Sequence, residues 1–390
     1  MIYLDNAATT RIDHEVLDAM MPYLTTMYGN AGTIYKIGRD ANMAVENARR
    51  QVADFIGCER PEQIIFTSGG TEANNLVIQG ITDYMRSNGK NHIIASAIEH
   101  DSVLNAIKKV CTKESFDYTL AKPDSTGHIA PSELRYLIRD GFTGLVSVMY
   151  VNNETGSEND IIEIANVCNE KGVLFHTDCV QAAGCYPVNA CEIGCDFLTI
   201  SSHKIHGPKG VGALCVKDPS ILQPLIVGGA FQEFGLRGGT ENVAGIVGFG
   251  KACEIAGKHL HDSDVRCSVL KQLFFSHLKD SLDFYGCGDI IHINGDPVIK
   301  HGKTINMRFD GVDGETLLLM LDSKDVYVSA GSACTSHESK PSHVLTAMGI
   351  TDEDARNSIR VSFSRLNTEE EVCDAAQIIA SCVNTIRLWR

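Results

Sequence analysis

The sequence has 390 residues, of which 44% are hydrophobic and 21% charged, and this composition is typical of a soluble globular enzyme with room for two domains. Its formal net charge of −15 argues against nucleic-acid or anionic-membrane binding by the surface as a whole. No apolar run approaches the roughly 20 residues of a membrane span, and the N-terminus lacks the basic and apolar regions of an export signal, so we expect neither.

Helices and short strands alternate along the first two thirds of the chain. Apolar residues recur at helical spacing over 38–57, and Gly57 ends that helix. The predicted strands that follow cover 64–66, 92–97, 145–151, 173–177, 196–200 and 211–216, and helices begin near 72, 101 and 161. This alternation predicts a mostly parallel sheet that is covered by helices on both faces.

The pattern changes beyond about residue 258. A long helix over roughly 264–283 precedes predicted strands near 304–309 and 325–329 and a final helix near 368–386. We therefore expect an α/β protein with a large domain at 14–258. A smaller α+β domain would combine residues 1–13 with 259–390.

The fourteen cysteines are scattered and contain no CxxC pair, so no disulfide framework and no metal site are predicted. Thirteen of them are expected to be small apolar residues of the interior. Together with the missing export signal, this indicates a reducing, cytoplasmic location. The exception is Cys334, which lies in the small-residue run 329–336 (SAGSACTS), where an exposed thiol is a liability unless its reactivity is used.

A lysine and an aspartate form the most informative pair. Lys204 lies in the run 201–210 (SSHKIHGPKG), twenty-six residues after Asp178, which follows the predicted strand 173–177. A single lysine is more often solvated, and a single aspartate at a strand end is often a helix cap. An amine that can form a Schiff base together with a carboxylate that can hold a protonated ring nitrogen is what pyridoxal 5'-phosphate (PLP) requires.

Three segments have the features of a phosphate site. Gly70 and Thr71 lie between a strand and a helix, where free N–H groups and the helix dipole favour an anion, although Thr71 could equally cap the helix. Ser201 and His203 flank Lys204, and the run 237–240 (RGGT) is a further glycine-rich turn.

Three other polar residues are candidates for the same site. His100 follows a strand and could stack on an aromatic ring and handle protons, but a surface histidine is the simpler interpretation. Gln181 could donate to a ring oxygen or be solvated. Arg360, in a strand-like run at 358–362, could clamp a substrate carboxylate or lie on the surface of an edge strand.

Together these segments resemble the group I cysteine desulfurases, the NifS/IscS-type branch of the class V aminotransferase-like, fold-type I PLP enzymes. The resemblance extends over nearly the whole chain. It rests on the runs 3–10 (YLDNAATT), 67–72 (TSGGTE), 151–156 (VNNETG), 201–210, 236–242 (LRGGTEN), the Cys334 segment and 358–360 (SIR).

The resemblance implies a role for each candidate residue. Lys204 would bind PLP, Asp178 would pair with the ring nitrogen, and His100 would stack on the ring. The remaining cofactor contacts would come from Gln181, Asn153, Gly70, Thr71, Ser201 and His203, with Thr240 reaching the phosphate in the other subunit of a homodimer. Arg360 and Asn153 would bind the carboxylate of L-cysteine.

The reaction that the resemblance implies is the conversion of L-cysteine to L-alanine, with Lys204 moving the α-proton and Cys334 taking the sulfur as a persulfide. The sulfur would pass to an acceptor protein, either for iron–sulfur clusters or for thiolated cofactors and tRNA. Neither direct nucleic-acid binding nor a membrane partner is expected.

The chain departs from the family at three places. Tyr35 stands where the family has a histidine, and tyrosine does not titrate near neutral pH as histidine does. Cys179 replaces a small residue after the aspartate, which allows a second thiol near the cofactor. The glycine-rich run 228–233 is one residue longer than usual.

Two alternatives remain open. The first is a selenocysteine lyase, or another PLP lyase or aminotransferase of the same fold, although Cys334 argues against transamination. The second is a sulfur-relay subunit that depends on a partner, which the intact set of Lys204, Asp178, His100 and Cys334 disfavours. Products formed from cysteine, selenocysteine and cysteine sulfinate would separate them.

Overall fold

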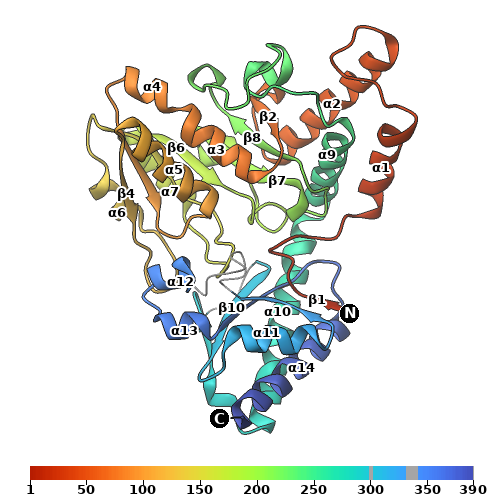
Figure 1. Ribbon diagram of the computed structural model, residues 1–390, viewed down its shortest axis with the longest axis vertical. Coiled ribbons are helices and arrows are strands. Elements are labelled where there is room, and N and C mark those ends of the chain that lie inside the picture. The colour runs from red at the N-terminus through yellow and green to blue at the C-terminus, as the bar shows by residue number, and fades with distance from the viewer. Residues whose placement is uncertain (298–301, 331–340, 390) are drawn as a thin grey trace.

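The computed structural model describes residues 1–297, 302–330 and 341–389, and Figure 1 shows them as a larger upper body and a smaller lower one. The larger body contains a seven-stranded sheet, and the smaller body contains a four-stranded sheet. Each has its own apolar core, as expected for an α/β chain with a second α+β unit. The boundary between domains at residue 258 stays a prediction.

The large sheet is mostly parallel, as the sequence predicts. Its strand order is β2-β8-β7-β6-β5-β3-β4, and only β8 runs antiparallel to both of its neighbours. The strands are β2 (Ile64–Thr67), β3 (His92–Ser96), β4 (Asp117–Ala121), β5 (Thr143–Ser147), β6 (Leu174–Asp178), β7 (Phe197–Ser201) and β8 (Gly212–Val216). Every residue of β2, β3, β5, β7 and β8 is buried, which explains their continuous apolar sequences.

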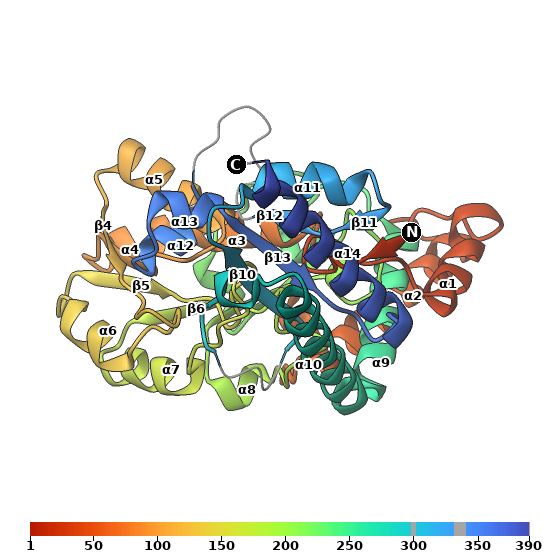
Figure 2. The same cartoon turned by 90° about the horizontal axis from the view of Figure 1, so that it is seen from below.

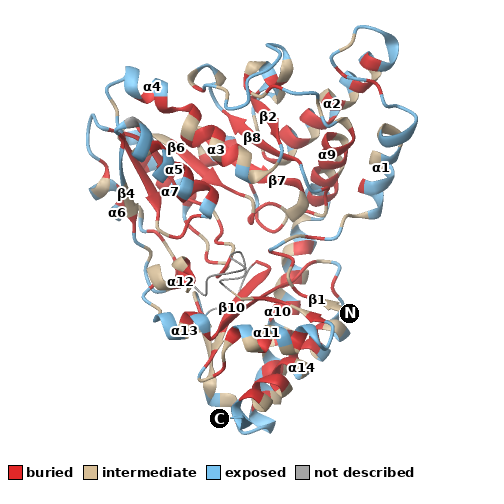
Figure 3. Ribbon diagram, in the orientation of Figure 1, coloured by how far each residue is buried: buried red, intermediate tan, exposed pale blue. Residues whose placement is uncertain are grey.

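Helices cover both faces of this sheet, and each face has its own core. One face packs against α1 (His14–Thr25), α2 (Lys36–Phe55), α6 (Pro131–Leu137), α7 (Ile161–Glu170), α8 (Ala190–Ile193) and α9 (Val243–Lys258). The other packs against α3 (Gly70–Gly80), α4 (Thr82–Ser87) and α5 (Asp101–Glu114). Figure 3 shows the strands buried between these layers, while much of α1 is exposed.

The small sheet is antiparallel, in the order β12-β13-β10-β9. Its strands are β9 (Ile291–Asn294), β10 (Thr304–Phe309), β12 (Ser329–Ala330) and β13 (Ser358–Ser362), and the short strands β1 (Ile2–Tyr3) and β11 (Val326–Tyr327) pair beside it. Its helices are α10 (Leu260–Phe284), α11 (Gly314–Asp322), α12 (His343–Ala347), α13 (Asp352–Arg356) and α14 (Glu369–Leu388). Figure 2 shows α10, α11 and α14 beneath the sheet, and the pairing of β1 brings the N-terminus to this body.

One expectation about the elements needs correction, and one alternative is excluded. The strand predicted to run to Val151 ends at Ser147, the last residue of β5 that pairs with both β3 and β6, although Val148 N–H and Tyr150 N–H still bond to His176 and Asp178. β13 is no edge strand: it lies between β12 and β10, and all five of its residues are buried. Arg360 is therefore an interior residue rather than a surface one.

The cysteines follow the expectation for small apolar residues only in part. Eight of the free cysteines that the structure describes are buried, whereas Cys191 is exposed and Cys111 and Cys373 are partly exposed. The sulfur atoms of Cys58 and Cys215 lie in contact, which their positions in the sequence do not predict. Among the described helices, none combines the length and the apolar character needed to cross a bilayer.

Candidate active site

A cavity of about 370 Å³ lies where the carboxyl ends of the large sheet's parallel strands meet the N-terminal segment and β13. Ligands of open parallel sheets bind at this edge because the loops after the strands diverge there. Ten of the residues predicted from the sequence line this single cavity: Gly70, Thr71, His100, Asn153, Asp178, Gln181, Ser201, His203, Lys204 and Arg360.

Lys204 lies at the end of the short 3-10 helix η2 (Ser202–Lys204), directly after β7. Its Nζ donates hydrogen bonds to the backbone carbonyls of Ala7 at 2.5 Å and Ala8 at 2.7 Å. Burial, together with the positive charges of Lys303 and Arg360, lowers the pKa of the amine to about 7. A large fraction of this amine is therefore neutral, and nucleophilic, near neutral pH.

Asp178 ends β6 and is held by two donors. Its Oδ1 accepts from Val180 N–H at 2.9 Å, and its Oδ2 accepts from Asn74 Nδ2 at 2.8 Å. No described helix begins at this aspartate, so the alternative that it caps a helix is not supported. Gln181 donates from Nε2 to the carbonyl of Ala7 at 2.9 Å, while its buried Oε1 has no partner within the described residues.

One end of the cavity has the features of an anion site. Helix α3 begins at Gly70, and its N-cap is Gly69, so Thr71 does not cap the helix. The backbone φ of Gly69 is +151°, a value that glycine adopts readily. The first N–H groups of a helix have no partners within it. Ser201 Oγ is buried and has no partner among the residues described. Burial, with the charges of Lys204, Lys209 and Lys303, lowers the pKa of His203 to about 4.

His100 precedes α5, and its ring nitrogen Nδ1 accepts a hydrogen bond from Ser102 N–H at 3.1 Å. The hydroxyl of Ser102 lies 2.8 Å from the same nitrogen. The imidazole is exposed and lines the cavity on the side of Asp178 and Asn74. The surface-histidine interpretation is correct about its exposure, but the ring has a fixed position at the cavity wall.

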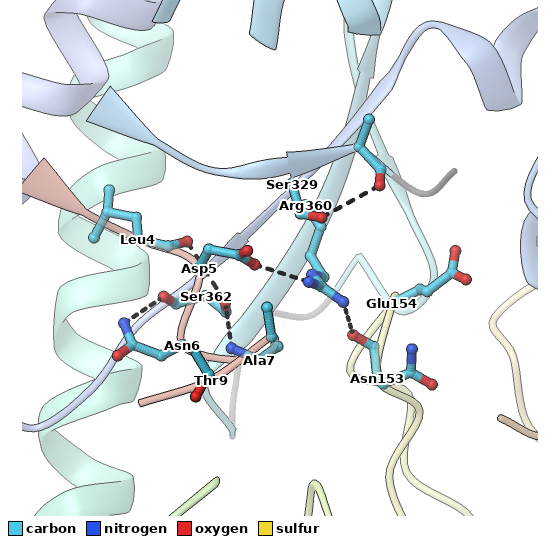
Figure 4. Close-up of polar contacts among 12 residues, drawn as sticks. Leu4, Asp5, Asn6, Ala7, Thr9, Asn153, Glu154, Ser329, Arg360 and Ser362 are labelled. Carbon is cyan, nitrogen blue, oxygen red and sulfur yellow. Dashed lines mark hydrogen bonds and ion pairs between the residues drawn. The ribbon is translucent and has the colours of Figure 1, made fainter. Parts of the chain in front are cut away.

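Arg360 brings together three segments that are remote in the sequence. Figure 4 shows its guanidinium between Asp5, at 2.8 Å, and the backbone oxygen of Asn153, at 2.9 Å. Its Nε is buried and has no partner within the part of the chain that the structure describes. Ser329 of β12 pairs with Arg360 and also lines the cavity. A planar cation held in this way can bind a carboxylate through two parallel bonds.

Of the two remaining predicted residues, Thr240 does not line this cavity and Cys334 is not described. Thr240 is exposed and lies outside the lining, in a segment that the ion pair between Arg237 and Glu72 (3.0 Å) attaches to α3. Cys334 lies outside the described residues, so its position relative to the cavity stays a prediction.

The departures from the family fall away from the reacting groups. Cys179 is fully buried, does not line the cavity and has a pKa raised well above its ordinary value, mainly by burial, so it is no second reactive thiol. Tyr35 is exposed at the start of α2. Glu233 of the lengthened run forms a buried ion pair with Arg49 at 2.8 Å.

Several polar residues of the site were not predicted from the sequence, among them Asp5, Asn74 and Ser102 in the cavity lining and Lys303 beside Lys204. Asn74 carries a signal that could have been used, since it precedes Val77 by three positions and therefore shares the apolar face of its helix. Nothing local distinguishes Asp5 or Lys303, because each reaches the site only through the tertiary fold.

Comparison with known proteins agrees with this geometry. The family model for the aminotransferase class-V family matches residues 2–374. A Methanosarcina thermophila protein named cysteine desulfurase IscS is 41% identical over 386 residues, covering 99% of this chain and 93% of that protein. The chain therefore belongs to the aminotransferase class-V family, and within it to the cysteine desulfurases.

Solved structures support the same assignment. A NifS-like protein superimposes with a TM-score of 0.88 at 34% identity, covering 97% of this chain and 98% of that one. A structure described as SspA in complex with cysteine gives a TM-score of 0.77 at 32% identity, covering 94% of this chain and all of that one. The predicted α/β architecture of a fold-type I enzyme is confirmed.

Proposed function

We propose that the protein is a PLP-dependent cysteine desulfurase, which converts L-cysteine to L-alanine and transfers the sulfur to Cys334. The observation that supports this most strongly is the convergence of Lys204, Asp178 and Arg360 on one cavity, which supplies an amine, a carboxylate and a substrate anchor. The relatives named cysteine desulfurase point to the same reaction.

The residues present suit PLP. Ser201 Oγ and Gln181 Oε1 are buried polar atoms without described partners, and such atoms are costly unless a ligand satisfies them. Ser201 lies at the anion end, with Gly70 and Thr71, and Gln181 lies beside Asp178. We infer that the phosphate binds at the first end, that the ring nitrogen faces Asp178, and that Lys204 forms the covalent link.

When bound, PLP supplies the electron sink that allows the α-proton of an amino acid to be removed. Arg360 holds the substrate carboxylate through hydrogen bonds from its guanidinium, together with Asn153. The Nζ of Lys204, neutral in large part near pH 7, takes the proton from the substrate Cα and returns one to the carbon fragment.

Cys334 is the sulfur acceptor in this proposal. Its thiolate Sγ forms a bond to the substrate Sγ as the substrate C–S bond breaks, and the electron pair of that bond stays with the carbon fragment, which becomes alanine after protonation. Ser329 lines the cavity five residues before Cys334, and five residues span at most about 17 Å. A tether of this length supports the proposal that the thiol meets the substrate in the cavity.

We propose further that the active unit is a homodimer. Apolar side chains on α1, α2 and the adjoining loops are exposed, including Ile34 at 89% and Phe231 at 99%. A face of this kind marks an interface, and a second copy placed there would also bring Thr240 toward the partner's phosphate site. A reducing compartment such as the cytoplasm suits a persulfide that must reach an acceptor protein for iron–sulfur clusters or thiolated products.

The experiment that tests this function combines spectroscopy with product analysis. The purified protein should show a visible absorbance band from bound PLP, and it should release alanine and a reducible sulfur equivalent when L-cysteine is added. Alanine formed from selenocysteine but not from cysteine would identify a selenocysteine lyase instead. Neither a visible band nor alanine, after incubation with PLP, would refute the proposal.

A further inference from the structure

We infer that Asn74 is a positioning residue that connects the carboxylate of Asp178 to the imidazole of His100 through the hydroxyl of Ser102. Asp178 and His100 would both contact the cofactor ring, so this connection would let Asn74 fix the positions of both side chains. The inference deepens the proposed function, and only its cofactor measurements depend on that function.

Asn74 occupies an unusual position for its residue type. It lies in the second turn of α3, is 1% exposed and lines the cavity. Asparagine is a weak helix former, and a buried amide is costly unless it is hydrogen-bonded. An apolar residue would be the stabilising choice here, so the side-chain bonds of Asn74 give the reason for its presence.

The side-chain amide of Asn74 donates two hydrogen bonds to two different segments of the chain. Its Nδ2 donates one hydrogen to Asp178 Oδ2 at 2.8 Å and the other to Ser102 Oγ at 2.9 Å. The opposite orientation of the amide would place Oδ1 against a carboxylate oxygen, where neither atom has a hydrogen to donate. The carboxylate of Asp178 therefore determines which way the amide points.

Ser102 continues the chain to the imidazole. Because its Oγ accepts from Asn74, its own proton is available to His100 Nδ1, 2.8 Å away. The backbone N–H of Ser102 also donates to this nitrogen, at 3.1 Å. Two donors at Nδ1 make it the acceptor of the ring, so a neutral His100 carries its proton on Nε2.

Asp178, Asn74, Ser102 and His100 thus form one hydrogen-bonded chain in which every bond has a defined direction. Bonds linked in this way strengthen one another, and a change at one end is felt at the other. The carboxylate that would face the ring nitrogen and the imidazole that would cover the ring are therefore held as a unit, rather than as two independent groups.

The test compares three variants. Asn74→Leu keeps the approximate shape of the side chain and removes both donors, Ser102→Ala removes only the hydroxyl, and Gln79→Ala is a polar-to-alanine control on the same helix. The nitrogen signals of the His100 ring are measured by NMR in the cofactor-free protein, with His100→Gln used for their assignment. PLP binding is then measured by titration, and the pH midpoint of the visible band is recorded.

Ser102→Ala should change the His100 Nδ1 signal, because one donor is lost, while PLP affinity stays within about twofold. Asn74→Leu should change the His100 signal, shift the midpoint of the visible band and weaken PLP binding about tenfold, the loss expected for one hydrogen bond to a charged group. Gln79→Ala should change none of these.

An unchanged His100 signal in Asn74→Leu would overturn the inference, whatever the signal of Ser102→Ala. If Asn74→Leu does not fold, Asn74→Ala, which also removes both donors, is measured in its place. A wild-type protein that binds no PLP would refute the proposed function, while the NMR comparison in the cofactor-free protein would still decide whether the chain of bonds exists.

Discussion

The carboxylate of Asp5 lies 2.8 Å from the guanidinium of Arg360, although 355 positions separate them in the sequence. The contact attaches the segment after β1 to the interior strand β13, and Arg360 reaches on to the backbone of Asn153. The group that would anchor the substrate is thus oriented by two partners from distant parts of the chain.

Replacing Asp5 should therefore weaken substrate binding. In Asp5→Asn the ion pair is lost and the guanidinium gains freedom, so we expect the KM for L-cysteine to rise about tenfold while kcat changes by less than about threefold. Steady-state alanine formation measures both constants. Asp310→Asn, which alters a surface contact with His292, is the control, and equal KM values in the two variants would contradict the role of Asp5.

Lys303 should contribute, after burial, to the lowered pKa of Lys204. Its Nζ lies 3.5 Å from the backbone carbonyl of Lys204, and its charge helps to lower the pKa of that amine to about 7. In Lys303→Met one repelling cation is lost, so the pKa of Lys204 should rise.

The rate at which PLP attaches to the cofactor-free protein follows the neutral amine. It should increase with pH and reach half its maximum near pH 7 in the wild type, and at a higher pH in Lys303→Met. Lys108→Met, on the exposed face of α5, should behave as the wild type. A midpoint that does not move in Lys303→Met would exclude this electrostatic role.

The ion pair between Arg49 and Glu233 should be a large contributor to stability. Both side chains are buried, two bonds of 2.8 and 2.9 Å join them, and Glu233 also accepts from Phe66 N–H. In Glu233→Ala the buried guanidinium keeps only the partly exposed Glu46 and the Ile64 carbonyl as partners, so the free energy of unfolding should fall by about 3 kcal/mol.

Urea unfolding measures this loss. The matched control is Glu170→Ala, which breaks the exposed pair with Arg135 and should cost no more than about 1 kcal/mol. If the two substitutions destabilise the protein equally, the buried pair is not the large contributor to stability that we expect.

Glu99 should make stability depend on pH. Burial raises the pKa of its carboxyl from an ordinary 4.5 to about 8, so the folded state binds a proton that the unfolded state has already released. The free energy of unfolding should therefore fall as the pH rises from about 4.5 to about 8, by on the order of 3–5 kcal/mol.

Glu99→Gln keeps the shape of the side chain and removes its titration. Relative to this variant, the wild type should lose stability between pH 5 and pH 8, as measured by urea unfolding at both values. A difference between the two proteins that is the same at both pH values would show that Glu99 does not titrate in this range.

The sequence predicts the part of the site that is carried by strand ends and glycine turns. Lys204, Asp178, His100 and Gly70 each follow or end a strand of one parallel sheet, so their local positions in the sequence already imply convergence. Arg360 was recognised too, but the sequence left open whether its strand lies at an edge, because an alternating run does not reveal its neighbours in the sheet.

What the sequence does not predict depends on long-range packing. Asp5 reaches Arg360 because β1 pairs with β11 and Asp5 itself bridges to Ser362 of β13. Lys303 reaches Lys204 only across the two bodies. α1 was missed for a different reason: Val16 is its only buried residue, so its apolar pattern is weak. The sequence indicates that Asn74 is a polar residue on an apolar helix face, but it does not indicate the hydrogen-bond partners of Asn74.

The most direct test of the central claim is mass spectrometry of the PLP-loaded protein. After borohydride reduction, the cofactor should be found on the peptide that contains Lys204. After brief treatment with L-cysteine and alkylation, the peptide that contains Cys334 should carry the mass of one additional sulfur atom. A cofactor attached to another lysine, or additional sulfur on other cysteines and none on Cys334, would contradict the account.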